Sequence, residues 1–379
     1  MTSPDWLHDP ETPYLLIDEA RYRNNIHRLY SHIEGLGSHV RPHLKTLRSA
    51  EAAAYLLKNA NSPATVSTLA EAEGFAKAGY TDLLYAVGIT PHKLDRVARL
   101  IHRGINLHLL LDTPQQVREL KEYAVLHNIT FSVFIEVDCD GHRGGLPADS
   151  TLLTELATMM DGEGVVLTGL LAHAGESYSC NNHEAIRLAA RKECEAIRAA
   201  GERIRAMGIT CPVLSVGATP TAHFCEELDG ISEVRAGVFT TFDLVMKNVG
   251  VCSISDIAMS VVTSVTGYNR AKNWIFVDAG WMALSRDRGT ASQAHDYGYG
   301  LVCDMNGTPL DRVCVSMTSQ EHGIISLPAG CGLTTDMFPV GSRLRILPNH
   351  ACATAAMHQQ YQVLTEEGKQ TTWHRITGW

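Results

Sequence analysis

This chain has little that would bind nucleic acid or enter a membrane. Its 32 Lys and Arg are outnumbered by 41 Asp and Glu, so the net charge of −9 leaves no basic footprint for nucleic acid. No apolar run is long enough to span a bilayer, which argues against a membrane protein. The first residues also lack the basic and apolar blocks of a secretory signal.

Paired cysteines are missing as well. The ten cysteines are scattered and include no Cys-x-x-Cys pair, which in a chain of 379 residues without a signal predicts reduced thiols and a cytoplasmic location. Repeats, low-complexity tracts and charged tails are absent, and the composition is that of an ordinary globular protein. The length favours two domains.

From about residue 38 to 242, short β-rich runs alternate with amphipathic helical segments. Such alternation predicts parallel βαβ units, and about eight of them in succession are typical of an α/β TIM barrel. Helices are expected between the strands, for example over 69–78, 113–127 and 182–207. The predicted strands are 39–45, 65–68, 83–87, 107–112, 131–138, 168–174, 213–217 and 233–239.

After residue 244 the pattern changes to short strands separated by glycine or asparagine turns, with almost no long helix. This pattern indicates an all-β domain, with strands at 261–266, 274–277, 313–318 and 343–346. The early run 13–18 precedes the barrel and is assigned to the same domain. We therefore expect a barrel over 25–245 and a β-rich domain built from 1–24 and 246–379.

Lys45 closes the first predicted strand, in the run Arg41-Pro42-His43-Leu44-Lys45-Thr46. Function in a TIM barrel gathers at the C-terminal ends of the strands, so this amine is expected in the barrel mouth. A neutral lysine amine in such a place can form a Schiff base. The alternative is a solvated surface lysine at a strand end.

Two later strand ends carry the small and hydroxyl residues that a phosphate group needs. Gly217, Ala218 and Thr219 follow the seventh predicted strand, and Gly237 and Val238 lie on the eighth. Small residues allow backbone N–H groups to approach an anion, and TIM barrels often bind phosphate at these two loops. The alternative is a pair of ordinary turns. Together with Lys45, these turns make pyridoxal phosphate a coherent cofactor.

A second candidate site lies in the β-rich domain. His350 and Cys352 are two residues apart on a predicted extended segment, so their side chains should share one face. Imidazole and thiolate are good ligands for zinc or a similar divalent ion. The alternative is a buried cysteine beside a structural histidine. His322, Asp278 and Asp287 are polar groups that could belong to a site or face solvent.

These segments together resemble the D-threonine aldolase/D-serine dehydratase family of fold-type III, alanine racemase-like pyridoxal phosphate enzymes. The resemblance covers essentially the whole chain in order. In the barrel it rests on the runs 41–46, 66–68, 140–143, 173–175, 217–221 and 233–238, and in the β-rich domain on 277–281, 320–323 and 348–352.

The resemblance implies roles for particular residues. Lys45 would be the Schiff-base lysine, Tyr178 would approach the cofactor ring, and Arg143 matches a family arginine near the cofactor. The cofactor phosphate would be held by Gly217, Ala218, Thr219, Gly237 and Val238. His350 and Cys352 would bind one divalent metal, zinc or manganese. Enzymes of this fold type usually form head-to-tail homodimers, so a homodimer is also expected.

The resemblance also implies the reaction. The family's dehydratases carry cysteine at the position of Cys352, whereas its aldolases tend to carry aspartate. This favours β-elimination from a D-3-hydroxy amino acid such as D-threo-3-hydroxyaspartate or D-serine, giving a 2-keto acid and ammonia. A D-3-hydroxy amino acid aldolase, releasing glycine and an aldehyde, is the first alternative. A non-catalytic pyridoxal-phosphate-binding protein is the second.

Overall fold

The computed structural model describes residues 4–160, 162 and 164–379. Residues 1–3, which belong to the segment that lacks the features of a secretory signal, lie outside the described residues. The chain forms two compact units. The barrel unit contains 27–237 and 376–379, and the β unit contains 1–26 and 238–375. From the sequence, the domain boundaries were expected between residues 24 and 25 and between residues 245 and 246. Among the described residues, no helix is both long and apolar enough to cross a membrane.

The barrel unit is built on a parallel sheet, and the predicted TIM barrel is confirmed. The sheet's two end strands are joined by a bridge between His43 and Thr65, with the Leu44 N–H donating to the Thr65 carbonyl at 2.9 Å. The parallel strands therefore close on themselves. In spatial order they are β2 (His39–Val40), β10 (Glu233–Val234), β9 (Val213–Val216), β8 (Val165–Ala172), β6 (Phe131–Asp138), β5 (Asn106–Leu111), β4 (Asp82–Gly88) and β3 (Ala64–Val66), with the short β7 (Leu146–Pro147) paired to β6.

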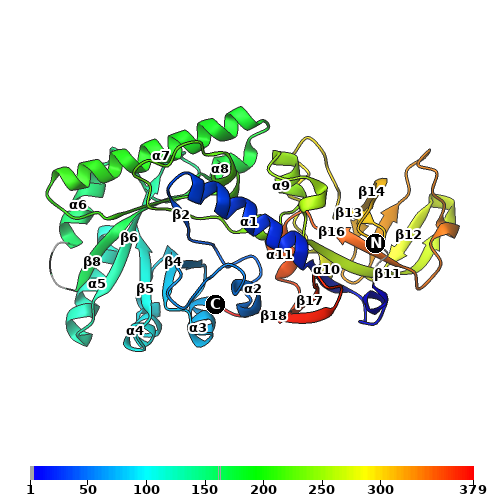
Figure 1. Ribbon diagram of the computed structural model, residues 1–379, viewed down its shortest axis with the longest axis horizontal. Helices are drawn as coiled ribbons and strands as arrows, with labels where there is room; N and C mark the ends of the chain where they lie inside the picture. Colours follow the sequence, from blue (N-terminus) through cyan, green and yellow to red (C-terminus); the bar gives the residue numbers. More distant parts are fainter. Residues whose placement is uncertain (1–3, 161, 163) are drawn as a thin grey trace. The chain divides into compact units, whose positions relative to one another are not determined.

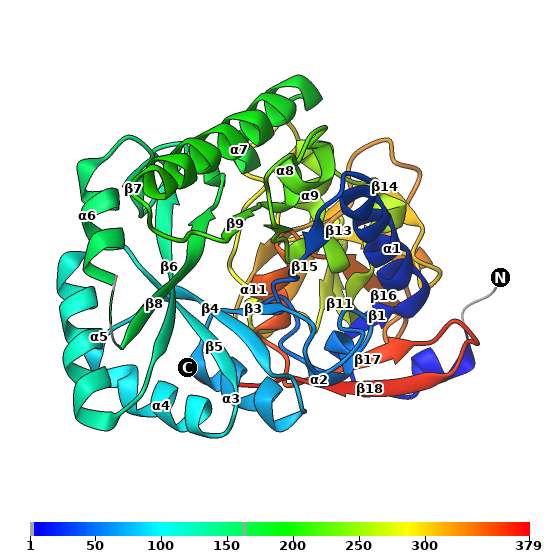
Figure 2. The same cartoon turned by 60° about the vertical axis from the view of Figure 1, so that its left-hand side comes forward.

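Amphipathic helices follow these strands along the chain and cover them (Figures 1 and 2). Several begin at residues that satisfy free backbone N–H groups; Thr113, for example, forms a capping box with Gln116. Inside the barrel, Leu84, Leu110, Phe134 and Leu171 pack together. The helices are α1 (Glu19–Gly35), α2 (Ala50–Ala53), α3 (Leu69–Lys77), α4 (Leu94–His102), α5 (Pro114–His127), α6 (Thr151–Met160), α7 (His183–Ala206) and α8 (Thr219–Phe224).

The first barrel strand is shorter than predicted. Regular pairing ends at Val40, and Lys45 lies in a turn two residues beyond the bridge at His43. Pro42 has no N–H to donate, which interrupts the regular ladder, although Arg41 and His43 still donate to the Val234 and Ala236 carbonyls at 2.9 and 2.7 Å. The helix after Lys45 is also not long, since α2 has four residues.

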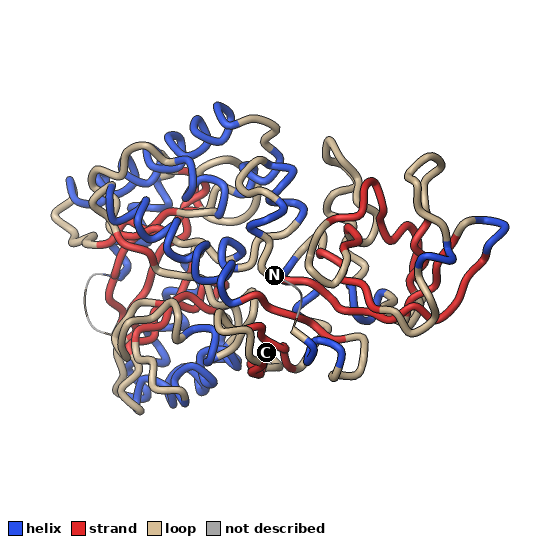
Figure 3. Tube along the Cα trace, turned by 45° about the vertical axis from the view of Figure 1, so that its right-hand side comes forward, coloured by secondary structure: helices blue, strands red, loops and turns tan. Residues whose placement is uncertain are grey.

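The β unit is an antiparallel barrel, which confirms the all-β prediction. Pairing of β11 with β12 closes six strands into a ring, and β1, β17 and β18 extend the sheet beyond it. Strands and loops make up most of this unit (Figure 3). The ring strands are β11 (Met259–Asn269), β12 (Trp274–Val277), β15 (Gly323–Ser326), β14 (Pro309–Thr318), β13 (Leu301–Cys303) and β16 (Arg343–Leu347), and the others are β1 (Tyr14–Asp18), β17 (Gln360–Leu364) and β18 (Gln370–His374).

Helices of the β unit are short, as the sequence predicted. They are α9 (Leu244–Val249), α10 (Trp281–Leu284) and α11 (Ala351–Ala355). The early strand β1 pairs antiparallel with β11 and parallel with β17, so the assignment of the run 13–18 to the β unit is confirmed. The core of this unit is a cluster of aliphatic side chains from the ring strands, including Val261, Val277 and Ile346.

The last four residues, 376–379, belong to the barrel unit. The Ile376 N–H donates to the Arg48 carbonyl at 2.7 Å, and Arg96 donates to the Trp379 carbonyl at 2.7 Å. A Cβ on Gly74 of α3 would lie 2.7 Å from Ile376 Cδ1, so glycine makes room for this tail. The tail therefore braces the segment that follows the Lys45 turn.

Candidate active site

The turn that carries Lys45 is anchored to the loop after β3. Arg48, three residues beyond Lys45, forms an ion pair of 2.5 Å with the buried carboxylate of Glu71. The other oxygen of Glu71 accepts the Ser67 N–H at 2.8 Å. The Lys45 side chain itself is exposed in the chain. A buried ion pair thus holds the backbone while the amine stays accessible to a ligand.

The loops after β8 and β9 contact each other directly. His173 Nδ1 donates to the Gly217 carbonyl at 2.8 Å, because a carbonyl can only accept. The Tyr178 hydroxyl accepts the Thr219 N–H at 3.4 Å, and the rings of His173 and Tyr178 are 6.2 Å apart. Two sequence-predicted residues, Tyr178 and Thr219, are therefore brought together at this end of the barrel.

Positive charge surrounds the histidines of this site. Burial lowers the pKa of His173 to about 4, and Arg143, Arg235 and Lys45 act in the same direction. Burial and the nearby Lys45 also hold the pKa of His43 well below its usual value. Both imidazoles are therefore neutral near pH 7. The remaining cationic groups favour an anionic ligand at this barrel end.

The residues predicted to hold a phosphate differ in what they can offer. Thr219 Oγ1 is buried and has no hydrogen-bond partner among the residues that the structure describes. A bound anion would satisfy it. The Gly217 N–H donates to Glu193 at 2.8 Å, and the Ala218 N–H donates to Thr221 Oγ1 at 3.1 Å, so both are engaged within the fold. The site fits an anionic cofactor, with Thr219 as its clearest donor.

Gly217 is also required for the fold itself. Its φ of 141° is rarely adopted by residues with a side chain, and a Cβ there would overlap the Arg235 carbonyl. Gly237 lies close to the first strand, since a Cβ on it would be 3.1 Å from the His43 carbonyl oxygen. Both glycines therefore allow close approach of backbone segments at this end of the barrel.

Arg143 and Val238 lie at the margins of the predicted set. Arg143 is in the loop after β6, and its guanidinium is 3.9 Å from the Glu136 carboxylate and largely exposed. Burial raises the pKa of Glu136, and Arg143 opposes that shift. Val238 is buried and starts a short 3-10 helix, Val238–Thr240, in the β unit. Among the described residues, neither forms a hydrogen bond with Gly217, Ala218 or Thr219.

The second candidate site is in the β unit. His350 is the N-cap of α11 and Cys352 lies in its first turn, so the segment is not the continuous extended run predicted from the sequence. β16 ends at Leu347, and the Ala351 N–H then donates to Asp243 at 2.9 Å. This hydrogen bond starts the helix instead of prolonging the strand. The two side chains still interact, because Cys352 affects the protonation of His350.

Asp287 orients the imidazole of His350. Its carboxylate is 2.6 Å from His350 Nδ1, which must be the donor. Burial alone would lower the pKa of His350, but hydrogen bonds with Asp287 and Cys352 raise it to about 11. Because Nδ1 is engaged by Asp287, Nε2 is the nitrogen that could share an ion with Cys352, in the carboxylate–histidine arrangement common at metal sites. The surroundings that stabilise an imidazolium also favour a metal cation, so these residues fit a divalent ion.

The donor set of this site is small. Within the part of the chain that the structure describes, no three His, Cys, Asp or Glu residues gather as a metal cluster. His350 and Cys352 would therefore leave positions open for other ligands, as in catalytic sites. The neighbouring Asn349 donates to the Gly298 carbonyl at 2.6 Å and holds the segment in place.

The other polar residues considered in the β unit have different surroundings. Asp278 accepts hydrogen bonds from Thr12 Oγ1 at 2.6 Å and Thr263 Oγ1 at 2.7 Å, so it ties strands together. His322 is exposed in a turn. Within the described part of the chain, Asp287 forms a hydrogen bond with His350, and neither Asp278 nor His322 does.

Sequence reasoning left several of these groups without a role. Asp287 is 63 residues from His350, and no local motif links the two. Arg235 directly follows β10 and is fully buried, donating to Ser215 Oγ and the Ala172 carbonyl. His173 could have been singled out, because it stands at a strand end five residues before Tyr178.

Comparison with known proteins agrees with this architecture. The family model "Alanine racemase, N-terminal domain" matches residues 17–244, and the model "Putative serine dehydratase domain" matches 258–364. A D-threo-3-hydroxyaspartate dehydratase of Delftia sp. strain HT23 is 45% identical over 379 residues, covering 99% of this chain and 100% of that enzyme. The chain belongs to the D-threonine aldolase/D-serine dehydratase family. A D-serine dehydratase of Dictyostelium discoideum is 30% identical over 96% of each chain.

Solved structures of family members have the same fold. An alanine racemase-like protein from Idiomarina loihiensis is 58% identical and superposes with a TM-score of 0.97 over 100% of both chains. A cysteine-to-alanine mutant of D-threo-3-hydroxyaspartate dehydratase, described as being in the metal-free form, is 44% identical with a TM-score of 0.96, covering 99% of this chain and 100% of that one. The barrel with a separate antiparallel β unit is therefore the family's architecture.

Proposed function

We propose that this protein catalyses the pyridoxal-phosphate- and metal-dependent dehydration of a D-3-hydroxy amino acid to a 2-keto acid and ammonia. The observation that carries the proposal is the presence of two complementary sites in one chain of this family. The barrel unit has Lys45 and neutral histidines amid positive charge. The β unit has His350 oriented by Asp287 beside Cys352. Relatives that are named as dehydratases support the reaction class.

In the barrel unit, Lys45 would hold the cofactor through its amine and, once released by substrate, would take the proton from Cα. When bound, pyridoxal phosphate supplies an electron sink for the charge left at Cα. Thr219 would donate its free hydroxyl to the cofactor phosphate. Tyr178, whose hydroxyl contacts the Thr219 N–H, would border the ring. Arg143 and Arg235 would add positive charge nearby.

In the β unit, His350 Nε2 and the Cys352 thiolate would hold one divalent ion. Such an ion supplies Lewis acidity, which a poor leaving group such as hydroxide requires. Asp287 would keep the imidazole in the tautomer that leaves Nε2 free. Zinc suits a nitrogen and sulfur donor pair, and manganese is the second candidate.

The proposal extends to substrate, assembly and location. D-threo-3-hydroxyaspartate and D-serine are the proposed substrates, by analogy with the relatives that are named for them. A homodimer is proposed from the fold type. A reducing, cytoplasmic location is proposed because none of the ten cysteines, all of which lie in the described part of the chain, forms a disulfide.

Product analysis tests the reaction. The purified protein, supplied with pyridoxal phosphate and zinc or manganese, would be incubated with D-threo-3-hydroxyaspartate, D-serine and D-threonine. We expect ammonia and the matching 2-keto acid. Release of glycine and an aldehyde would overturn the proposal in favour of the aldolase. Cofactor binding without turnover of any of the three would favour a non-catalytic binding protein.

A further inference from the structure

A carboxylate lies in the apolar stripe of α7. Ala190, Cys194 and Ile197 recur at helical spacing on the buried face of this helix, and Glu193 stands among them with 1% of its surface exposed. Burying a carboxyl group is costly unless hydrogen bonds compensate. Glu193 is not part of the chemistry proposed above, so its burial needs a separate explanation.

The hydrogen bonds of Glu193 connect two active-site loops. Its Oε1 accepts the Ala174 N–H, in the loop after β8, at 3.1 Å. The same oxygen accepts the Gly217 N–H, in the loop after β9, at 2.8 Å. Its Oε2 accepts the Thr221 hydroxyl at the start of α8 at 2.9 Å. One side chain from α7 therefore binds both loops and the helix between β9 and β10.

The residues next to these contacts are those proposed to meet the cofactor. Gly217 donates its N–H to Glu193 and accepts His173 Nδ1–H with its carbonyl, so Glu193 and His173 hold the same residue. Thr219 follows two positions later, and its N–H meets the Tyr178 hydroxyl. Moving the Gly217 backbone would thus shift His173, Thr219 and Tyr178 together.

We propose that Glu193 is a positioning residue that fixes the cofactor-phosphate loop against the loop carrying His173 and Tyr178. This inference rests on the proposed function, since it assumes that Thr219 faces a cofactor phosphate. Glu193 acts through backbone geometry and does not itself touch the cofactor. Loss of its acceptors leaves two buried N–H groups unpaired, and we expect the loops to separate in order to hydrate them.

Substitutions can separate hydrogen bonding from charge. Glu193→Gln keeps the size of the side chain; its carbonyl oxygen can accept both N–H groups while its amide donates to Thr221 Oγ1. Glu193→Ala removes all three contacts. Glu195→Gln and Glu195→Ala are matched controls, because Glu195 is exposed on the same helix. Thr221→Val removes one of the three Glu193 contacts with little change in shape, together with the acceptor of the Ala218 N–H.

The test measures pyridoxal phosphate binding and the phosphorus NMR signal of the bound cofactor. In Glu193→Ala we expect a dissociation constant about 10-fold or more higher, with a shifted and broadened phosphorus signal. Glu193→Gln should stay within about 2-fold of the parent, and Thr221→Val should give an increase of about 3-fold. The Glu195 variants should match the parent protein.

The outcomes distinguish this inference from the proposed function. A parent protein that does not bind pyridoxal phosphate would refute the proposed function. If the parent binds it, but Glu193→Ala lowers only the melting temperature and leaves the dissociation constant and phosphorus signal unchanged, Glu193 is merely structural. Should Glu193→Ala fail to fold, unchanged binding and an unchanged phosphorus signal in Thr221→Val would overturn the inference in the same way.

Discussion

Histidines in the two units stand in opposite electrostatic surroundings. In the barrel unit, burial together with Arg143, Arg235 and Lys45 lowers the pKa of His173 to about 4. In the β unit, Asp287 and Cys352 outweigh burial and raise the pKa of His350 to about 11. The same side chain is therefore a neutral group in one unit and a stabilised cation in the other.

This difference indicates what each unit is built to bind. A barrel mouth that keeps its imidazoles neutral beside the guanidiniums of Arg143 and Arg235 favours an anion such as a phosphorylated cofactor. A histidine held between a carboxylate and a thiol favours a cation, because the charge that stabilises a proton also stabilises a metal ion. The predictions below alter one of these environments at a time.

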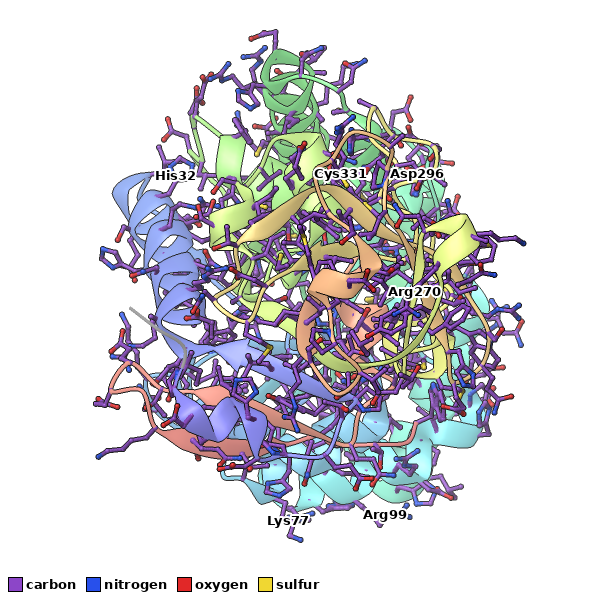
Figure 4. All side chains as sticks on the ribbon, turned by 90° about the vertical axis from the view of Figure 1, so that its right-hand side faces the viewer. His32, Lys77, Arg99, Arg270, Asp296 and Cys331 are labelled. Carbon is purple, nitrogen blue, oxygen red and sulfur yellow. The ribbon has the colours of Figure 1, made fainter. Side chains whose placement is uncertain are left out.

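The largest effect is expected from removing the barrel amine. Lys45→Ala should lower kcat by about 10³-fold or more and abolish covalent attachment of the cofactor, because no other group in the proposed site can replace the amine. Turnover, visible absorbance and mass after borohydride reduction would be measured. Lys77→Ala is the control, since Lys77 extends from the surface of α3 (Figure 4). A Lys45→Ala protein that kept both activity and covalent cofactor would place the attachment elsewhere.

The next largest effect is expected from emptying the cation site. Chelation should abolish turnover and leave the visible absorbance of the cofactor intact, because the cofactor and the metal ion would be held by different units. Added zinc or manganese should restore turnover. Cys352→Ala should lower metal content and slow ammonia release far more than exchange of the substrate α-proton with solvent. Cys331→Ala, at a different cysteine of the β unit (Figure 4), is the control.

Two results would count against this role of the metal. Verified metal-free protein that eliminates at the original rate would show that no ion is needed. Equal losses of proton exchange and ammonia release in Cys352→Ala would indicate that the ion mainly positions the substrate.

Much of the fold could be read from the sequence because it depends on local patterns. The alternation of strands and helices gave the barrel, and the change after residue 244 gave the β unit. Lys45 was singled out because function in such barrels gathers at strand ends, and its role stays a prediction. The strand that leads to Lys45 was predicted too long, because its apolar pattern continues past Pro42, a residue that has no N–H to donate to the ladder.

The parts that could not be predicted depend on contacts between distant segments. Asp287 forms a hydrogen bond with His350, which is 63 positions away in the sequence. Asp243 accepts the Ala351 N–H at the start of α11, 108 positions away. The prediction that His350 and Cys352 lie on an extended segment was wrong, because the Asp243 carboxylate accepts the Ala351 N–H and α11 begins at that residue. Glu193 did carry a signal, because a carboxylate in an apolar helical stripe is unusual, but only the fold shows which N–H groups it accepts.

A smaller effect is expected from weakening the cation site without removing a ligand. Asp287→Asn keeps the size of the side chain but removes the negative charge beside His350 Nδ1. Metal affinity should fall about 10–100-fold, as is usual when such a partner is lost. Competition with a chromophoric chelator would measure it. Asp336→Asn is the control, because Asp336 forms an exposed ion pair with Arg270 of the same unit. Arg270 is labelled in Figure 4. Unchanged affinity in Asp287→Asn would mean that Asp287 does not orient the ligand.

The smallest effect on activity is expected from the ion pairs at the other end of the barrel strands. Arg41 donates to Glu233 and to Asp82, each at 2.7 Å. Burial would raise the pKa of Glu233, but Arg41 outweighs it and holds the pKa below its usual value; the pKa of Asp82 is lowered by His108 and Arg41 against the same burial.

These depressed pKa values fix the sign of a pH effect on stability. Near pH 7 both carboxylates are ionised in the folded and unfolded chain, so the ion pairs contribute fully to stability. The contribution is lost as pH falls below the usual carboxyl pKa, because protons then bind the unfolded chain more tightly.

Urea unfolding at pH 7 and at pH 4 should show a lower free energy of unfolding for the barrel unit at pH 4. Glu233→Gln should lower it by about 3–5 kcal/mol at pH 7, by leaving Arg41 buried with one fewer partner, and should reduce its dependence on pH. Glu34→Gln, at an exposed pair with Lys58, should change neither quantity measurably. An equal pH dependence of the free energy of unfolding in the parent and in Glu233→Gln would show that the pKa of Glu233 is not lowered in the folded barrel.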